Sequence, residues 1–200
     1  MGLAQIIMSD NTITSADERD LIELARRDVE TFQKLYRWYS PRVYAYIAFR
    51  VRNKQDAEDI VAETFLRVVE NLHQFEYRGE GSFAAWVFCI ARNCLGQFYR
   101  TQHSRGSPLS LDELPDQPSD APTPVEAATR HELRAQLQKA IAGLSSRKQE
   151  IITLKFFGGL RNKEIAEILG LNERTVASHL CQAIADLRRA CPIKLGEEEE

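Results

Sequence analysis

The sequence has few of the features that mark secreted, membrane-spanning or metal-binding proteins. Its 200 residues include only four cysteines, at 89, 94, 181 and 191, with no CxxC pair and no histidine at metal-ligand spacing. We therefore expect free thiols and no bound metal or other cofactor, with redox or zinc sensing as the alternative. No apolar run approaches the roughly 18 residues of a membrane span, and the first ten residues do not resemble a secretory signal. These absences predict a cytoplasmic protein without membrane insertion.

Sequence patterns of catalysis are also missing. The chain contains no glycine-rich phosphate-binding loop, no Ser/His/Asp arrangement and no carboxylate set with metal-ligand spacing. Glu58, Asp59 and Glu63 could imitate a metal site, but acids on a helix surface are more often solvated or bound to a basic partner. We therefore expect no enzyme and assign no catalytic residue.

Strict alternation of apolar and polar residues is rare in this chain, whereas apolar residues recur at helical spacing almost everywhere. The pattern predicts an all-α protein. Helices are expected from Ser15 with a Ser15/Glu18 capping box, along the apolar positions 32 to 51 with a restart at Ser40–Pro41, from about Asp56 to Leu72, from Ser82 onward, at about 125 to 142, from Ser146 to Phe157 with a Ser146/Gln149 capping box, and at 161 to 169 and 173 to 190.

Charge and proline divide the chain into blocks. Residues 31–106 carry eleven Lys/Arg against seven Asp/Glu, and residues 143–191 carry eight against five. Between them, residues 107–132 hold one arginine against six acids, and five of the seven prolines lie between 108 and 124. This composition is typical of a flexible linker. The predicted organisation is an N-terminal extension with a short helix (1–28), a helical bundle (29–106), an acidic Pro-rich linker (107–130), a second helical domain (131–191) and an acidic tail (192–200).

The stretch RNKEIAEILGLNERTVASHL, residues 161–180, has the pattern of a helix-turn-helix. Gly170 can take the left-handed conformation that ends the first helix, and Asn172 can cap the second. Small and polar side chains remain on the outer face near the N-terminus of the second helix, where a major groove can accept them. By pattern alone the alternative is an ordinary helix pair in a bundle.

A second candidate nucleic-acid surface lies in FAAWVFCIARNCLGQFYRTQHSR, residues 83–105, which interleaves aromatic and basic residues. Aromatic rings can stack on unpaired bases while guanidinium groups hold phosphates, a combination that suits single-stranded DNA. Trp86 and Phe98 lie at helical spacing, so most of these aromatics should belong to the core. Asn93, Tyr99 and the arginines remain as candidate contacts.

Three segments, read together, resemble the extracytoplasmic-function (ECF, group IV) sigma factors of the sigma-70 superfamily. They are DAEDIVAETFLRVVENL (56–72), FAAWVFCIARN (83–93) and LSSRKQEIITLKFFGGLRNKEIAEILGLNERTVASHL (144–180), in this order and separated by the acidic linker. The resemblance spans about 29 to 190. It implies a region-2 domain followed by a region-4 helix-turn-helix domain. It also implies a factor that binds bacterial core RNA polymerase, recognises the minus-35 duplex and the minus-10 element of promoters, and promotes DNA melting.

The resemblance also implies roles for individual residues. Those expected to bind the polymerase clamp are Glu58, Asp59, Glu63, Leu66 and Arg67. Those expected to bind minus-10 DNA are Tyr77, Arg78, Arg92, Asn93, Tyr99, Arg100 and Arg105. Those expected to bind minus-35 DNA are Asn162, Lys163, Arg174, Thr175, Ala177, Ser178, His179 and Gln182. Ala177, His179 and Gln182 depart from the basic residues that are usual in the family, and Gln97 stands where an acid is common.

The expected partners are core RNA polymerase, promoter DNA and an anti-sigma factor, with the chain a monomer when free of them. Two alternatives stay open at this point. One is a free-standing helix-turn-helix regulator that binds a duplex operator, usually as a symmetric dimer. The other is an interaction protein that sequesters a partner through the 56–72 helix. The second basic block and the acidic helix weigh against the first, and specific binding to a two-element promoter would weigh against the second.

Overall fold

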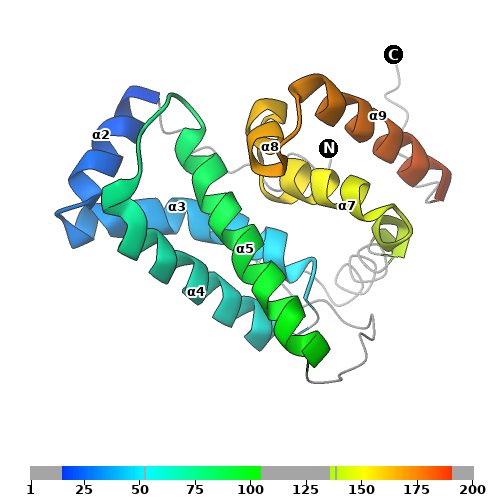
Figure 1. The fold of residues 1–200 in the computed structure, drawn as a ribbon, viewed down its shortest axis with the longest axis horizontal. Helices are drawn as coiled ribbons and strands as arrows, with labels where there is room; N and C mark the ends of the chain where they lie inside the picture. Colours follow the sequence, from blue (N-terminus) through cyan, green and yellow to red (C-terminus); the bar gives the residue numbers. More distant parts are fainter. Residues whose placement is uncertain (1–14, 52, 105–135, 138, 191–200) are drawn as a thin grey trace, which may run out of the picture.

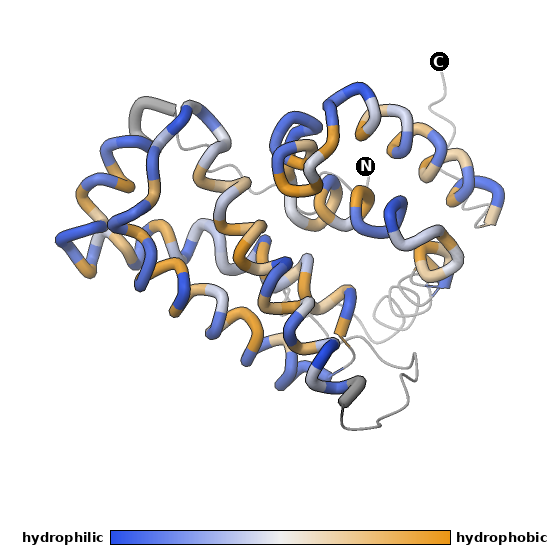
Figure 2. Tube along the Cα trace, viewed as in Figure 1, coloured by the Kyte–Doolittle hydropathy of each residue, from blue (hydrophilic) through white to orange (hydrophobic). Residues whose placement is uncertain are grey.

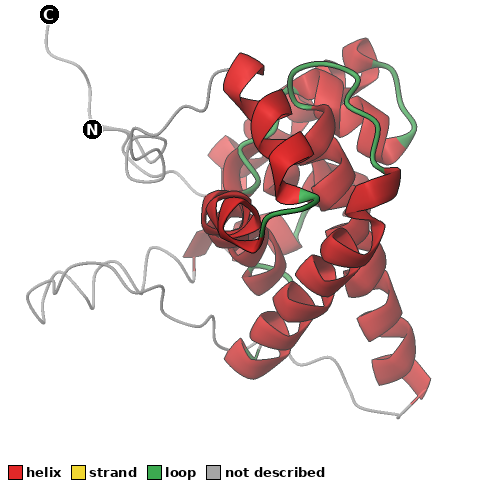
Figure 3. Ribbon diagram, turned by 90° about the vertical axis from the view of Figure 1, so that its left-hand side faces the viewer, coloured by secondary structure: helices red, strands yellow, loops and turns green. Residues whose placement is uncertain are grey.

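The computed structural model describes residues 15–51, 53–104, 136–137 and 139–190 (Figure 1). Within these ranges the chain forms helices and loops without a strand (Figure 3), so the all-α prediction is confirmed. Arg105, the proposed linker, the first 14 residues and the acidic tail lie outside the described residues. Among the described helices, none is long and apolar enough to cross a bilayer.

The N-terminal domain consists of α2 (Ser15–Ala25), α3 (Val29–Ala48), α4 (Lys54–Asn71), a 3-10 turn at Leu72–Gln74 and α5 (Ser82–Ser104). Hydrophobic residues recur at intervals along each of these helices, with hydrophilic residues between them (Figure 2). Each helix therefore presents an apolar stripe to the others. The aromatic residues at the centre of the bundle include Tyr39, Phe75 and Phe83, whose rings pack edge to face.

One local prediction for this domain is wrong, and another, the helix that begins at Ser82, is confirmed. Helix α3 does not restart at Ser40–Pro41 but runs through Pro41. Proline in a helix interior costs about 3 kcal/mol because it lacks the N–H that would bond the preceding turn. Here the apolar stripe continues on both sides of it, with Tyr39 and Val43 both buried, so packing outweighs that cost. Ser82 is the first residue of α5, and its hydroxyl accepts a hydrogen bond from the Arg78 amide at 3.2 Å.

The C-terminal domain consists of α7 (Ser146–Ile152), a π-helical turn at Thr153–Phe157, α8 (Asn162–Leu169) and α9 (Glu173–Ala190). The predicted Ser146/Gln149 capping box is wrong. Ser145 occupies the cap position, and the Gln149 side-chain amide instead donates to the carbonyls of Ala142 and Leu144, at 3.0 and 2.8 Å. The glutamine therefore closes the end of the preceding turn instead of the start of its own helix.

The helix-turn-helix prediction is confirmed in its local geometry. Gly170 lies at φ 63° and ψ 37°, the left-handed conformation that ends α8. Asn172 Oδ1 accepts hydrogen bonds from the Thr175 amide at 2.7 Å and from its hydroxyl at 2.8 Å. These bonds satisfy donors at the start of α9. Ile165, Val176 and Ala183 are fully buried between the helices.

The two domains pack directly against each other. Helix α5 lies along α8, and the end of α3 lies against the π-helical turn (Figure 1). A single apolar cluster contains Tyr46 and Phe88 from the first domain and Ile151 and Leu154 from the second. The arrangement is therefore closed, with α5 placed between the α4 side of the first domain and the helix-turn-helix.

Candidate functional site

The first part of the candidate site is a hollow of about 400 Å³ at the middle of α5. The structure brings together four of the predicted minus-10 residues around it. The lining residues are Arg50, Arg67, Arg92, Asn93, Leu95, Gly96, Gln97, Tyr99, Arg100 and Glu150. Four guanidinium groups against one carboxylate make this a positively charged surface, which suits a phosphate-bearing strand.

Helix α5 determines which of these side chains are available. Asn93 and Arg100 are exposed, whereas Arg92 and Tyr99 are half-buried. The Tyr99 hydroxyl donates to the Arg50 carbonyl at 2.5 Å, which ties the C-terminal half of α5 to the end of α3. Burial raises the pKa of Tyr99 above its ordinary value. Tyr99 therefore positions the surface as well as lining it.

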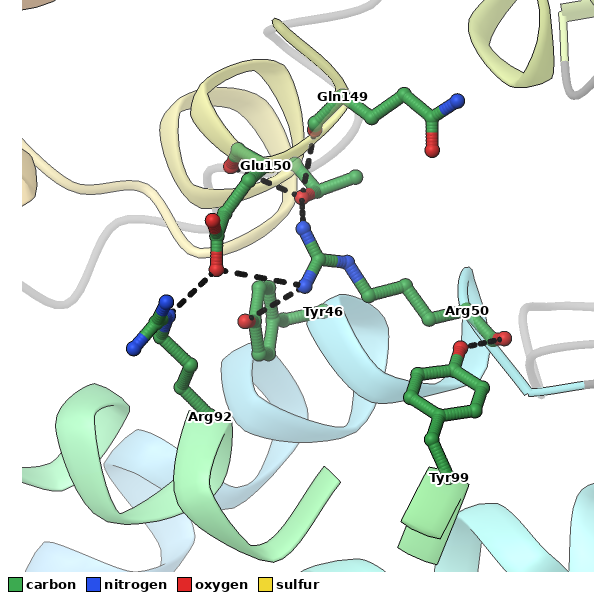
Figure 4. A network of polar contacts seen from close by, with 7 residues as sticks. Tyr46, Arg50, Arg92, Tyr99, Gln149 and Glu150 are labelled. Atoms are coloured by element: carbon green, nitrogen blue, oxygen red, sulfur yellow. Dashed lines mark hydrogen bonds and ion pairs between the residues drawn. The ribbon is translucent and has the colours of Figure 1, made fainter. Parts of the chain in front are cut away.

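Arg92 is held by an acid from the other domain. Its Nε lies 2.7 Å from Oε1 of Glu150 in α7 (Figure 4). The hydrogen bond to Glu150 raises the pKa of Arg92. Arg50 lies on the other side of the same carboxylate at 3.9 Å, and it donates to the hydroxyls of Tyr46 at 2.9 Å and Thr153 at 2.8 Å. The sequence analysis did not select Arg50, because its partners Glu150 and Thr153 come from a segment far away in the sequence.

Tyr77 and Arg78 do not join this cluster. They precede the N-terminus of α5, in the loop that follows the 3-10 turn. Arg78 is exposed and lies 3.5 Å from the carboxylate of Glu76. The predicted minus-10 set is thus divided between the middle of α5 and the loop before it.

The second part of the candidate site is the outer face of α4. Glu58 and Asp59 are exposed, and Leu66 is an exposed large hydrophobic residue, at 54 % of its full area. Val69, which the sequence prediction omitted, is 51 % exposed on the same helix. Its signal was its spacing of three residues from Leu66, which places both side chains on one face. An apolar pair beside acids is an arrangement suited to a basic protein partner.

Arg67 lies differently from the other predicted clamp residues. Its Nε lies 2.7 Å from Glu63 Oε1, and a terminal nitrogen donates to Gln97 Oε1 at 2.9 Å. The hydrogen bond to Glu63 raises the pKa of Arg67. The side chain therefore bridges α4 to α5 and reaches the hollow, and Gln97 supplies a neutral acceptor for it.

The third part of the candidate site is the N-terminal half of α9. Most of its predicted DNA contacts are exposed, namely Arg174, Ala177, Ser178 and Gln182, together with Lys163 on α8. Thr175 is half-buried and bonded to Asn172. His179 and Asn162 are also half-buried, and His179 Nδ1 and Asn162 Oδ1 are buried without a hydrogen-bond partner among the described residues. The exposed set is the part that can reach a groove.

Groups of metal ligands and paired thiols are absent from these surfaces. Among the described residues, no three His, Cys, Asp or Glu side chains come close enough to hold a metal ion. Cys89, Cys94 and Cys181 are free thiols, and burial raises the pKa of Cys94.

Beneath the hollow, Tyr46 provides a pH-dependent contribution to stability. Burial raises the pKa of Tyr46 from an ordinary 10.0 to about 12. The phenol therefore stays protonated in the folded state to a higher pH than in the unfolded chain. Its stabilising contribution is complete below pH 10 and is lost as the pH rises through 12. At pH 11 the loss is about 1 kcal/mol.

We expect the free energy of unfolding of the wild type to fall more steeply between pH 9 and pH 11 than that of Tyr46→Phe. Urea denaturation at the two pH values measures both slopes. The buried phenol of Tyr39, whose pKa is also raised, is present in both proteins and cancels in the comparison. Equal slopes in the two proteins would contradict the assignment of the titration to Tyr46.

A helix-turn-helix domain joined to a helical bundle with a basic face is an arrangement suited to a DNA-binding protein with two domains. Residues 35–105 match the family model for Sigma-70 region 2, and residues 134–187 match that for Sigma-70 region 4. The chain is 34 % identical to the ECF RNA polymerase sigma factor BldN of Streptomyces coelicolor, over 89 % of this chain and 67 % of that protein. It is 28 % identical to the ECF RNA polymerase sigma factor SigX of Bacillus subtilis, over 80 % of this chain and 83 % of that protein.

Solved structures agree with the fold. The chain superposes with a TM-score of 0.63 on CnrH in complex with the cytosolic domain of CnrY, at 23 % identity and covering 86 % of this chain and 94 % of that one. The TM-score is 0.62 for the sigma factor RpoE in complex with the anti-sigma factor NepR from Bartonella quintana, at 22 % identity, over 82 % of this chain and 98 % of that one.

The chain belongs to the ECF sigma factors of the sigma-70 superfamily. Proteins of this family are transcription initiation factors. This chain is accordingly an alternative sigma factor that binds core RNA polymerase and directs it to promoters.

Proposed function

We propose that this sigma factor divides promoter recognition among the three surfaces described above. The α5 hollow captures the non-template strand of the minus-10 element, α9 reads the minus-35 duplex, and the α4 face binds the polymerase clamp. The observation that carries this proposal is the convergence of Arg92, Asn93, Tyr99 and Arg100 on one charged hollow.

The α5 hollow suits a single strand because its polar and charged groups serve different parts of a nucleotide. Arg92 and Arg100 can hold phosphates, and the exposed amide of Asn93 can donate to and accept from the edge of an unpaired base. Opening a duplex costs a few kcal/mol for each unstacked base. Binding the extruded bases offsets this cost, so melting requires no catalytic group of the protein's own.

The α9 surface suits a duplex because its exposed residues are small or polar near a helix N-terminus. Ala177 and Ser178 let the helix approach the base edges closely, and Arg174 can bind a phosphate or a guanine edge. The N-terminal dipole of α9 also favours a phosphate. His179 and Thr175 are half-buried, so they act more in holding α9 than in reading bases.

The proposal extends to location and partners. Since a sigma factor acts on the polymerase and the chromosome, we place this chain in the cytoplasm as a monomer when it is free of partners. The two solved neighbours named above are complexes, one with the cytosolic domain of CnrY and one with the anti-sigma factor NepR. By analogy we propose an anti-sigma factor as a further partner of this chain.

Transcription in vitro tests the proposed division of roles. Bacterial core polymerase is combined with a genomic fragment library, with and without this protein, and the RNA starts are sequenced. We expect new starts that share two upstream motifs. On one such promoter, Arg92→Ala/Asn93→Ala should lower the rate of open-complex formation at least about tenfold, because a hydrogen bond to a charged group contributes about 1.5–3 kcal/mol.

The matched control is Arg188→Ala, an exposed arginine in the last turn of α9, away from the hollow. It should leave the open-complex rate near that of the wild type. If the double variant opens the promoter as fast as the control, the proposed role of the α5 hollow is refuted. If no new starts appear with the wild type, the promoter-directing role itself is contradicted for this polymerase.

A further inference from the structure

The closed arrangement places an acid of the C-terminal domain on the surface proposed to bind single-stranded DNA. Oε1 of Glu150 lies 2.7 Å from Arg92 Nε and 3.9 Å from a terminal nitrogen of Arg50 (Figure 4). The Glu150 side chain is 16 % exposed, so this carboxylate is largely withdrawn from water. A carboxylate between two guanidinium groups presents oxygens as a phosphate would.

Hydrogen bonds to groups other than Glu150 hold Arg50 in place. Thr153, one turn further along the helix, accepts from Arg50 at 2.8 Å, and its hydroxyl also contacts the carbonyls of Gln149 and Glu150. Arg50 in turn donates to Tyr46, and its guanidinium lies 4.6 Å from the centre of that ring. Arg50 is therefore positioned by groups other than the Glu150 carboxylate.

Other contacts close the two domains together. The guanidinium of Arg42 donates to the carbonyl of Gly158 at 2.8 Å and more weakly to that of Gly159 at 3.3 Å. A Cβ on Gly158 would lie 3.0 Å from the Phe88 ring, so the turn and α5 are in close contact. At the start of α8, Arg161 lies 2.9 Å from the carboxylate of Glu80.

The contacts between the domains cover part of one proposed DNA surface and leave the other exposed. The α5 hollow is partly occupied by Glu150, whereas α9 packs on α7 and α8 and keeps Arg174 and Ser178 exposed (Figure 1). Promoter elements two helical turns apart are separated by ~70 Å along the duplex. Two domains that pack side by side cannot reach both elements, so closure and promoter binding exclude each other.

We infer that Glu150 acts as an internal substitute for a DNA phosphate, and that it holds the free sigma factor in a closed form that blocks the minus-10 surface. Releasing the carboxylate exposes Arg92 and Arg50 to the non-template strand and lets the domains separate. This inference rests on the proposed role of the α5 hollow. It predicts that the free protein binds single-stranded DNA more weakly when the two domains are closed than when they are separated.

The sharpest test is Glu150→Gln, which keeps the shape of the side chain and removes its charge. Fluorescence energy transfer between dyes on unnatural residues at the exposed positions Lys34 and Arg188 reports domain separation in the full chain. A fluorescent oligonucleotide carrying the non-template strand of a mapped promoter reports binding. We expect lower transfer efficiency and about tenfold tighter oligonucleotide binding, within the range typical of coupling between two conformations.

The matched control is Asp186→Asn, which removes a carboxylate that pairs with Lys148 at 2.7 Å and with Arg189, all within the C-terminal domain. It should change neither the transfer efficiency nor the binding. Circular dichroism melts of both variants establish that each is folded. The pair Arg92→Glu/Glu150→Arg should restore the high transfer efficiency, because the swapped charges re-form the contact, whereas Glu150→Arg alone should lower it.

Two results would overturn the inference. Unchanged energy transfer in Glu150→Gln would show that the carboxylate does not hold the domains together. Lower transfer without tighter oligonucleotide binding would show that closure does not block the hollow. The promoter-opening assay with Arg92→Ala/Asn93→Ala then distinguishes failure of this inference from failure of the proposed minus-10 role of the α5 hollow. If this variant opens the promoter slowly, the proposed minus-10 role is retained and only the inference about Glu150 fails. If it opens the promoter as fast as the wild type, the proposed minus-10 role is refuted as well.

Discussion

Replacing Leu66 with aspartate is expected to weaken binding to core RNA polymerase at least about thirtyfold and to abolish transcription at limiting concentration. Leu66 is 54 % exposed on α4, beside the exposed Val69 and between the acids Glu63 and Glu70. An apolar anchor at the centre of an interface contributes about 2 kcal/mol or more, and a buried unpaired charge adds a further cost. Co-purification with core polymerase and a fluorescence titration measure the change.

Leu24 provides the matched control for this prediction. Leu24 is 60 % exposed on α2, about as exposed as Leu66. Leu24→Asp should therefore change the free energy of unfolding by about as much as Leu66→Asp does. We expect it to bind the polymerase as the wild type does. Equal binding by Leu66→Asp and Leu24→Asp would contradict the assignment of the α4 face as the clamp surface.

Replacing Phe88 with alanine is expected to cost about 3–5 kcal/mol in the free energy of unfolding, the usual range for truncation of a buried phenylalanine. Phe88 is fully buried, and its ring lies 5.6 Å from that of Tyr46, edge to face. Arg42 lies 5.9 Å from the centre of the same ring, and Gly158 packs close to its edge. The change therefore leaves a cavity where the two domains meet. Urea denaturation measures it.

Phe156 is the control for the effect of losing a phenyl ring. It is 46 % exposed, so Phe156→Ala removes less area from the interior and should cost no more than about 1 kcal/mol. If Phe88→Ala also loses no more than about 1 kcal/mol, the structure around Phe88 collapses into the cavity, and the contact between the domains is less rigid than its packing suggests.

The parts of the fold that the sequence predicted well depend on local interactions. Gly170 ends α8 because only its own backbone has to tolerate φ 63°, and Asn172 caps α9 through an amide three residues away. The acidic and apolar face of α4 follows from helical spacing alone. Each of these features involves residues within one turn of each other, so the printed sequence contains the whole interaction.

The predictions that failed concerned residues for which a local interaction competes with a contact made elsewhere in the folded chain. Pro41 was expected to begin a helix, yet the buried stripe on either side carries α3 through it. Gln149 was expected to cap its own helix, but carbonyls of the preceding turn compete for the same amide. In both places the local preference was real and a contact made in the folded chain was stronger.

The candidate site was predicted in part. Arg92, Asn93, Tyr99 and Arg100 were identified from their pattern on one helix, and the structure places them on one hollow. Arg50 and Glu150 were not identified, because the contact between them joins segments far apart in the sequence. Their role exists only once α3, α5 and α7 are packed together.

The all-helical chain, the helix-turn-helix, and the basic and acidic helix faces follow from the amino-acid order, because periodicity, capping and turn chemistry act over a few residues. The contact of Arg92 with Glu150, across a sequence separation of 58 residues, and that of Arg42 with the Gly158 carbonyl, across 116, arise only in the packed fold. Such pairings depend on how apolar stripes pack in three dimensions, and a stripe specifies which face is buried but not which other stripe covers it.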